Sequence, residues 1–374
     1  MIWFDIVIVG GGIAGASLGA ELVGRPAGTP NRVLLVEAEA HPGMHSTGRS
    51  AAFWLESYGG PGVVALSTAS HDFLSSPPTD FAEQGFLRAR GAIHVDSSGR
   101  ADAFAHIPES VATRAMSRAE LDAAVPGLRT QFVQAIAEPG CADIDVAALH
   151  AAYLRQLRRG GGTVRTNSRL VAAERSGAAW RIRLEDGSSV EAGMLVNAAG
   201  AWADSVAVAA GRAPLGIAPK RRTMVQLRVK RSGIARLQQV LDAAGSFYFK
   251  GEADHSVWVS PHDEIATDPC DAQPEEIDIA VAIDRFERAV DWPVERVERS
   301  WAGLRSFAPD RLPVYGFDSA TRDFLWFAGQ GGFGIQTAPA AAKLAAALLT
   351  GEAPDQMVAD IDPSPYAPTR FATR

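Results

Sequence analysis

The chain has 374 residues, of which 47% are hydrophobic and 21% charged, and its formal net charge at pH 7 is −7. This length and composition are typical of a globular protein with two domains, and the acidic balance argues against a nucleic-acid partner. Cys141 and Cys270 have no neighbouring Cys or His at metal-ligand spacing, so we expect neither a metal site nor a disulfide framework. The sequence shows no basic leader segment and no apolar run long enough to cross a bilayer. We therefore expect a cytoplasmic protein with no transmembrane segment.

The first fifty residues contain a nucleotide-binding pattern. An apolar run over residues 4–9 predicts a buried strand, the glycine-rich stretch 10–15 predicts a tight turn, and the residues after it predict a helix. Glycine is needed there because a Cβ would keep the backbone away from a pyrophosphate at the helix N-terminus. A second apolar run, 33–36, ends at Glu37, about 20 positions past the last glycine, where an acid accepts hydrogen bonds from a ribose. Since Glu37 would repel a 2′-phosphate, FAD or NAD is favoured over NADP, and a glycine turn in another α/β unit is the alternative.

Residues 45–52 follow this unit and are rich in small and hydroxyl side chains, with a single arginine. Such a composition suits contact with a second stretch of phosphate and with an isoalloxazine ring, whereas a plain polar loop is the alternative. The candidate cofactor-contacting residues of the N-terminal region are Gly10, Gly12, Ile13, Ala14, Gly15, Glu37, Ala38, His45, Ser46, Thr47, Arg49, Ser50, Ala51 and Ala52.

The rest of the chain alternates between segments of mainly apolar strands and helices and one segment of polar, alternating strands. Apolar strands and helices return at 146–154, where Asp145 is the expected N-cap, at 163–200 and at 324–349, whereas 216–309 carries polar, alternating strands and one helix near 274–290. We predict an α/β protein with a Rossmann-like FAD-binding domain and a strand-rich α+β substrate domain, that is, a glutathione reductase-type FAD fold. The predicted FAD-binding domain comprises 1–88, 145–215 and 310–374, and the predicted substrate-binding domain comprises 89–144 and 216–309.

Six segments spread along the chain resemble one enzyme family. They are 45–52 (HSTGRSAA), 142–145 (ADID), 196–202 (VNAAGAW), 219–222 (PKRR), 301–307 (WAGLRSF) and 330–337 (QGGFGIQT). Together they are similar to the D-amino acid oxidase superfamily of FAD enzymes, in its glycine oxidase and sarcosine oxidase branch, and most of all to its D-amino acid dehydrogenase group, which includes the D-arginine dehydrogenases. The cysteine that carries flavin in some members has no counterpart here, so the resemblance implies non-covalent FAD.

The resemblance also implies further site residues. Further cofactor contacts are implied at Val171, Ala199, Gly200, Trp202, Gly331, Gly332, Phe333, Gly334, Ile335 and Gln336. Arg222 and Arg305, with Tyr58 and Tyr248, are implied to bind a substrate α-carboxylate over the flavin, where Gly332 also lies. Guanidinium groups match carboxylates in a bidentate geometry. The glycines at 331–334 are expected to expose N–H groups at the start of a helix over 335–349, where they would stabilise reduced flavin.

Two positions depart from the D-arginine enzymes. Phe53 stands where those enzymes have a histidine, and Ala92 stands where they have the glutamate that recognises a cationic side chain. A buried cation without a counter-charge is unfavourable, so we expect a substrate with an apolar or aromatic side chain.

The predicted reaction is oxidative deamination of a D-amino acid to a 2-oxo acid and ammonia, by hydride transfer from Cα to flavin N5. The electrons would pass to a separate acceptor, which could be a quinone, a dye or O₂. Two alternatives stay open: an oxidase of glycine, sarcosine or another secondary amine, and a 2-hydroxy acid oxidoreductase.

Overall fold

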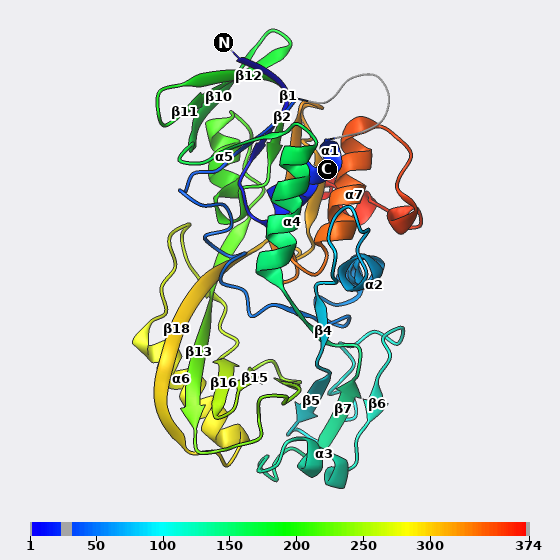
Figure 1. Cartoon of the computed structure of the whole chain (residues 1–374), viewed down its shortest axis with the longest axis vertical. Helices are drawn as coiled ribbons and strands as arrows, with labels where there is room; N and C mark the ends of the chain where they lie inside the picture. Colours follow the sequence, from blue (N-terminus) through cyan, green and yellow to red (C-terminus); the bar gives the residue numbers. More distant parts are fainter. Residues whose placement is uncertain (1, 24–31, 372–374) are drawn as a thin grey trace.

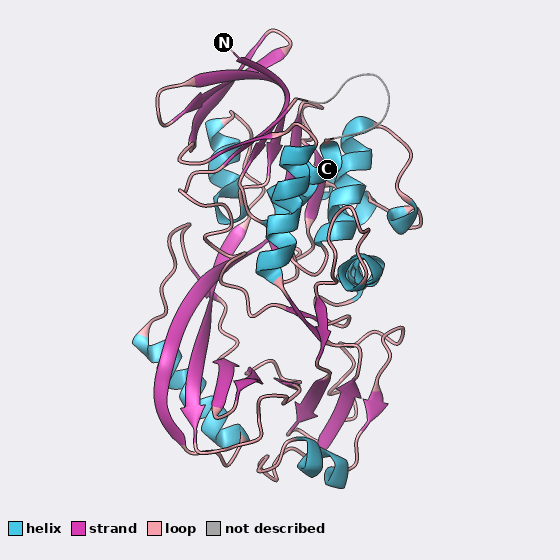
Figure 2. Cartoon of the chain, in the orientation of Figure 1, coloured by secondary structure: helices cyan, strands magenta, loops and turns pink. Residues whose placement is uncertain are grey.

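A computed structural model describes residues 2–23 and 32–371, and their strands form three sheets (Figures 1 and 2). The eight-stranded sheet contains β1 (Ile2–Val9), β2 (Val33–Val36), β9 (Thr163–Arg165), β10 (Leu170–Ser176), β11 (Ala179–Leu184), β12 (Ser189–Asn197), β19 (Val314–Phe317) and β20 (Phe324–Ala328). The ten-stranded sheet contains β5 (Ala92–Asp96), β6 (Arg114–Ala115), β7 (Gln134–Glu138), β13 (Ala218–Val229), β14 (Gln239–Asp242), β15 (Tyr248–Ala253), β16 (Ser256–Ser260), β17 (Ile265–Ala266), β18 (Val294–Phe307) and β21 (Gln330–Gly331). The third sheet contains β3 (Phe53–Trp54), β4 (Leu87–Ala89) and β8 (Ala142–Ile144).

The helices pack mainly around the eight-stranded sheet. They are α1 (Ile13–Leu22), α2 (Pro61–Ser75), α3 (Arg118–Ala124), α4 (Val146–Arg159), α5 (Ala203–Ala209), α6 (Glu276–Ala289) and α7 (Ala338–Thr350), with short 3-10 turns η1 (Gly200–Trp202), η2 (Gln356–Val358), η3 (Ser364–Tyr366) and η4 (Pro368–Phe371). In Figure 1, α1, α4 and α7 lie together in the upper half, whereas α6 lies along β13 and β18 in the lower half.

The central parallel strands of the eight-stranded sheet are buried on both faces, which explains the apolar run at residues 6–9 in β1. Ile6 and Ile8 point into a core shared with α1 and α7, and Val7 and Val9 point into a core shared with α5. β1 pairs in parallel with β2 and β12, so the carboxyl ends of these strands meet at one edge. Nucleotides bind at this edge in sheets of this kind.

The ten-stranded sheet is mostly antiparallel and has two different faces. Val225, Val259 and Phe249 belong to a core that also contains Phe286 of α6. Tyr248 and Met224 belong to a separate small cluster on the other side. Alternation along each strand therefore leaves one face free to present polar side chains toward the eight-stranded sheet.

Several predicted elements agree with the structure. Asp145 accepts a hydrogen bond from the Ala148 N–H at 2.9 Å, as expected of an N-cap. One boundary was wrong: α7 begins at Ala338, three residues later than the predicted helix over 335–349. Before it, residues 330–331 pair with the end of β18.

The composition of the sheets supports the two-domain division that we propose. The eight-stranded sheet draws its strands from 2–36, 163–197 and 314–328, whereas the ten-stranded sheet draws on 92–138 and 218–307. β21 adds two residues to the ten-stranded sheet from within the proposed FAD-binding range.

Candidate active site

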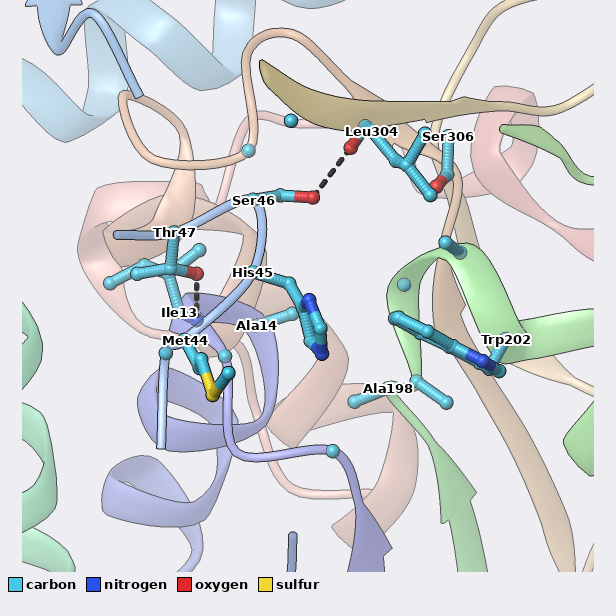
Figure 3. Close-up of a pocket in the computed structure, with 18 of the residues that line it drawn as sticks. Ile13, Ala14, Met44, His45, Ser46, Thr47, Ala198, Trp202, Leu304 and Ser306 are labelled. Atoms are coloured by element: carbon cyan, nitrogen blue, oxygen red, sulfur yellow. Dashed lines mark hydrogen bonds between the residues drawn. The ribbon is translucent and has the colours of Figure 1, made fainter. Parts of the chain in front are cut away.

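A large cavity lies at the carboxyl edge of the eight-stranded sheet and opens toward the ten-stranded sheet. At its start, Gly10 has a φ of +108°, and a Cβ there would lie 2.4 Å from the carbonyl oxygen of Ala198. Helix α1 follows directly, and Thr47 Oγ1 accepts a hydrogen bond from the Ile13 N–H at 3.0 Å (Figure 3). The turn therefore brings bare backbone and a helix N-terminus to the cavity, an arrangement that binds phosphate.

Glu37 ends β2 at the same edge and is only 9% exposed. One carboxylate oxygen accepts a hydrogen bond from the Gly11 N–H at 2.8 Å, and the other accepts one from the Glu39 N–H at 2.9 Å. Each oxygen keeps a further lone pair. The carboxylate is therefore held in place by backbone and can still accept hydrogen bonds from ribose hydroxyls.

The loop at 44–49 and the segment at 198–202 form two facing walls of the cavity (Figure 3). The rings of His45 and Trp202 lie 4.7 Å apart, and His45 Nε2 is 3.0 Å from a carboxylate oxygen of Glu39. His45 Nδ1 is buried, and within the described residues it has no hydrogen-bond partner. Ser46 donates a hydrogen bond to the Leu304 carbonyl, which ties this loop to β18.

The cavity brings together most of the predicted cofactor residues. Those that line it are Gly10, Gly12, Ile13, Ala14, Glu37, Ala38, His45, Ser46, Thr47, Arg49, Ser50, Ala51, Ala199, Gly200, Trp202, Gly331, Gly332, Gly334 and Ile335. The residues outside the lining are Gly15, Ala52, Val171, Phe333 and Gln336.

Strand alternation turns the Val171 side chain away from the cavity. Val171 is 40% exposed, whereas its neighbour Leu170 is buried and lines the cavity with Ser168 and Arg169. Gly15 has a packing role, since a Cβ there would lie 1.9 Å from the carbonyl oxygen of Gly10.

Four of the predicted substrate residues meet at the far end of the cavity. Arg222, Arg305, Tyr248 and Gly332 line it. Tyr58 lies directly behind them, because its hydroxyl accepts a hydrogen bond from Arg305 Nη1 at 2.7 Å. A Cβ on Gly332 would lie 2.3 Å from that hydroxyl, so a side chain there would displace Tyr58 from its place beside Arg305. The Tyr248 hydroxyl donates to Met224 Sδ at 3.1 Å, a weak acceptor that an anion could replace.

The surroundings of Arg222 are those expected of an anion-binding site. Its side chain is only 4% exposed, Nε donates to the Asp263 carbonyl at 2.6 Å, and Nη2 lies 3.4 Å from Glu264 Oε1. Nη1 is buried and has no hydrogen-bond partner among the described residues. Burial, and then the charge of Arg305, lower the pKa of Arg222. A bound carboxylate would supply the missing acceptor and would offset the repulsion between Arg222 and Arg305.

Arg305 is held in the charged state by its surroundings. Burial by itself lowers the pKa of Arg305, but the oxygens of Tyr58 and Tyr248 and two nearby carboxylates outweigh it, so that the pKa is raised. Two guanidinium groups therefore face the same end of the cavity.

Phe53 and Ala92 lie behind this end rather than on its surface. The ring of Phe53 lies 5.9 Å from the rings of both Tyr58 and Tyr248. Ala92 is fully buried and packs in a cluster with Leu55, Cys141, Phe53 and Tyr58. The wall behind the tyrosines is therefore apolar.

Sequence reasoning missed several residues that line the cavity. They are Val9, Val36, Glu39, Gly43, Met44, Ser168, Arg169, Leu170, Ala198, Ala201, Ser205, Val206, Met224, Gly303, Leu304, Ser306 and Gln330. Gly303, Leu304 and Ser306 flank Arg305 in a segment already noticed, so the neighbours of that arginine were a usable signal. Met224 lies two positions after Arg222 on β13, and period-two alternation would have placed it on the same face.

These features fit FAD. The glycine turn and the N-terminus of α1 would hold the pyrophosphate, and Glu37 would hold the adenosine ribose. Segments 303–306 and 330–332 would lie along the flavin end, next to the two arginines.

Comparison with known proteins also indicates an FAD-binding protein. The family described as DAO, FAD dependent oxidoreductase, matches residues 5–348. A D-amino-acid oxidase of Bradyrhizobium diazoefficiens is 36% identical over 81 residues, which cover 22% of this chain and 18% of that protein. The chain therefore matches less than a fifth of the length of that relative.

Solved structures share the fold over nearly the full length. Glycine oxidase from Geobacillus kaustophilus has a TM-score of 0.83 at 21% identity and covers 99% of each chain. L-proline dehydrogenase from P. horikoshii has a TM-score of 0.84 at 20% identity, covering 99% of this chain and 98% of the other. An L-alpha-glycerophosphate oxidase from Mycoplasma pneumoniae with FAD bound has a TM-score of 0.80 at 16% identity, covering 94% and 95%.

The fold and the cavity thus define an FAD-dependent oxidoreductase with a mixed α/β architecture. The chain belongs to the DAO family, whose model matches residues 5–348. Within the described residues, no helix is long and apolar enough to cross a membrane.

Proposed function

We propose that the protein catalyses FAD-dependent oxidative deamination of D-amino acids, with preference for apolar or aromatic side chains. The observation that carries this proposal is the pair Arg222 and Arg305 at the flavin end of the cavity, where one buried guanidinium N–H has no partner among the described residues. The motifs shared with D-amino acid dehydrogenases and the D-amino-acid oxidase relative support the D configuration.

The two arginines would bind the substrate carboxylate. Arg305 Nη1 already donates to the Tyr58 hydroxyl, so the hydroxyl proton of Tyr58 is free to be donated to a ligand. The Tyr248 hydroxyl can exchange its weak Met224 partner for a carboxylate oxygen. Two charges and two hydroxyls would then hold the α-carbon in one orientation.

FAD supplies the redox chemistry when bound, by accepting a hydride from the α-carbon, and water then hydrolyses the imino acid to a 2-oxo acid and ammonia. The residues around the carboxylate are guanidinium groups and phenols, which are not bases at neutral pH. We therefore expect the amine to react in its neutral form. A separate acceptor, which could be a quinone, a dye or O₂, would take the electrons.

The apolar wall supports the side-chain preference. Phe53, Leu55 and Ala92 pack behind the two tyrosines, and no acid occupies position 92 to neutralise a cationic side chain. At the cavity surface itself, Met224 and Tyr248 offer apolar atoms, and burying a Leu- or Phe-sized group against them gains roughly 1.5–3 kcal/mol. A guanidinium in the same place would lack a counter-charge.

Steady-state kinetics with a dye acceptor across a D-amino acid series tests the proposal. We expect kcat/KM for D-Leu, D-Met or D-Phe to exceed that for D-Arg by about tenfold or more, in line with that burial energy. The matching L-amino acids serve as controls.

Each alternative gives a different result. Activity confined to glycine or N-methyl amines would indicate an amine oxidase. Anaerobic flavin bleaching by 2-hydroxy acids alone would indicate a hydroxy acid oxidoreductase, and a D-Arg optimum would contradict the apolar preference.

A further inference from the structure

A buried carboxylate, Glu138, lies next to the loop that carries Tyr58. Glu138 ends β7, is only 1% exposed and stands opposite Ala92 in the β5–β7 ladder. Its two oxygens accept hydrogen bonds from Ser57, one from the backbone N–H at 3.1 Å and one from the hydroxyl at 2.7 Å. Ser57 directly precedes Tyr58, so this pair of bonds is one residue away from the proposed carboxylate site.

The carboxylate of Glu138 has a third polar partner. His94 Nε2 lies 3.0 Å from Glu138 Oε2, and His94 is itself only 3% exposed. Three polar groups therefore surround the acid that stands opposite Ala92 in the ladder. This acid does not replace the glutamate that Ala92 lacks, because it is buried outside the cavity lining.

The loop between β3 and α2 needs outside support. Tyr58 is followed by Gly59 and Gly60, with φ values of +99° and +72°, so the chain after the tyrosine has a conformation that glycine tolerates best. Gln336 holds the other side of the loop. Its side-chain oxygen accepts a hydrogen bond from the Leu55 N–H, and its side-chain nitrogen donates one to the Leu55 carbonyl, both at 3.2 Å.

The loop is thus fixed from two directions. Gln336 reaches it from the segment that precedes α7, and Glu138 reaches it from the ten-stranded sheet. The Tyr58 hydroxyl meets Arg305, which belongs to a different strand of that same sheet. Glu138 is therefore a second link between the sheet that carries the arginines and the loop that carries the tyrosine, and it binds the backbone of that loop rather than the tyrosine itself.

We propose that Glu138 is a positioning residue that, through Ser57, holds the Tyr58 hydroxyl in the geometry that binds a carboxylate with Arg305. This inference rests on the proposed carboxylate site but does not depend on which amino acid is the substrate. Because Glu138 would act only through Tyr58, its effect on ligand binding must vanish once the Tyr58 hydroxyl is removed.

A double-mutant cycle on the FAD-loaded enzyme tests this coupling. The probe is benzoate, whose binding is followed by the change in flavin absorption. We expect Tyr58→Phe to raise the Kd for benzoate about tenfold, the usual effect of losing one hydrogen bond to a charged group. Glu138→Gln should raise the Kd by about three- to tenfold, because an amide cannot accept from all three donors. The double variant should match Tyr58→Phe within about twofold.

Glu298→Gln is the matched control. Glu298 also belongs to the ten-stranded sheet and accepts hydrogen bonds from Arg228, Gln226 and Ser256, but it lies outside the cavity lining. Its Kd for benzoate should equal that of the wild type. Ser57→Ala removes only the hydroxyl bond to Glu138, so it repeats the test if Glu138→Gln does not fold.

Three results would overturn the proposal. Wild-type affinity in both Glu138→Gln and Ser57→Ala would show that the loop needs no support. A double variant weakened by the product of the single effects would show that Glu138 does not act through Tyr58. Absence of benzoate binding by the wild type would contradict the proposed carboxylate site itself. By contrast, benzoate binding with this coupling but no turnover of D-amino acids would contradict the proposed function alone.

Discussion

The two ends of the cavity are built by different means. The cofactor end is built mainly from backbone: Gly10 has no side chain, and the N-terminus of α1 presents backbone N–H groups. Its one acid, Glu37, is itself held by two backbone N–H groups. The proposed substrate end uses charged and aromatic side chains from separate strands and loops, and Arg222 and Arg305 come from β13 and β18. Added side-chain atoms at the cofactor end should therefore weaken FAD binding, whereas loss of charge at the substrate end should lower kcat/KM.

The largest expected effect is loss of charge at the substrate end. Arg222→Met or Arg305→Met should lower kcat/KM for the best substrate by at least about 100-fold, or roughly 3 kcal/mol, because a charge-assisted contact to the carboxylate is lost. FAD content should not change, since neither guanidinium belongs to the glycine turn.

Arg228→Met is the control for this pair. Arg228 also lies on β13, but it pairs with Glu298 away from the cavity. Near-normal kcat/KM in both test variants would mean that the substrate carboxylate binds elsewhere, and the contrast between the two ends would not hold.

An added methyl group should act on the cofactor end. Gly10→Ala would place a Cβ 2.4 Å from the Ala198 carbonyl oxygen at a φ of +108°. We expect FAD affinity to fall at least about 30-fold, or roughly 2 kcal/mol, from backbone strain and displacement of the turn. FAD content after gel filtration measures this. Gly177→Ala has a φ of +62° but no atom within 4 Å of its Cβ, so it should keep FAD.

The same preparation tests non-covalent binding. Denaturation without proteolysis should release all of the FAD from the wild type. Flavin that stays attached to the denatured chain would contradict this expectation.

The smallest effect concerns the pH dependence of stability at the substrate end. Burial and the charges of Arg222 and Arg305 lower the pKa of His262 to about 3, and its Nδ1 donates to the Gly245 carbonyl at 2.6 Å. The unfolded chain has the ordinary histidine pKa near 6.5, so it binds the proton first as the pH falls. His262 therefore contributes stability that is fully present above about pH 6.5 and is lost progressively toward pH 3.

We expect His262→Asn to reduce the loss of stability between pH 7 and pH 5 by on the order of 1–2 kcal/mol. Denaturant unfolding at the two pH values measures the difference. His41→Asn changes an exposed histidine and serves as the control. An unchanged pH dependence in His262→Asn would mean that burial and the two arginine charges together do not lower the pKa of this ring, and the environment that we infer for the substrate end would not hold.

The sequence by itself determined most of the cofactor end. Strand, turn, helix and second strand follow one another within residues 2–36, and Glu37 comes next, so their spacing alone placed them correctly. Such contacts are local, and period-two and helical patterns describe them well. Even here, one choice needed the structure: Leu170 rather than Val171 faces the cavity, because a shift of one residue along a strand reverses the face.

The substrate end was decided by the tertiary structure. The resemblance suggested Arg222, Arg305, Tyr58 and Tyr248, but no spacing relates residues that lie up to 247 positions apart, as Tyr58 and Arg305 do. The pairing of β13 with β18 brings the two arginines onto one face, and the ladder between β5 and β7 sets Glu138 opposite Ala92. Long-range strand register depends on how both faces of the sheet are buried, and a single sequence does not specify it from local pattern alone.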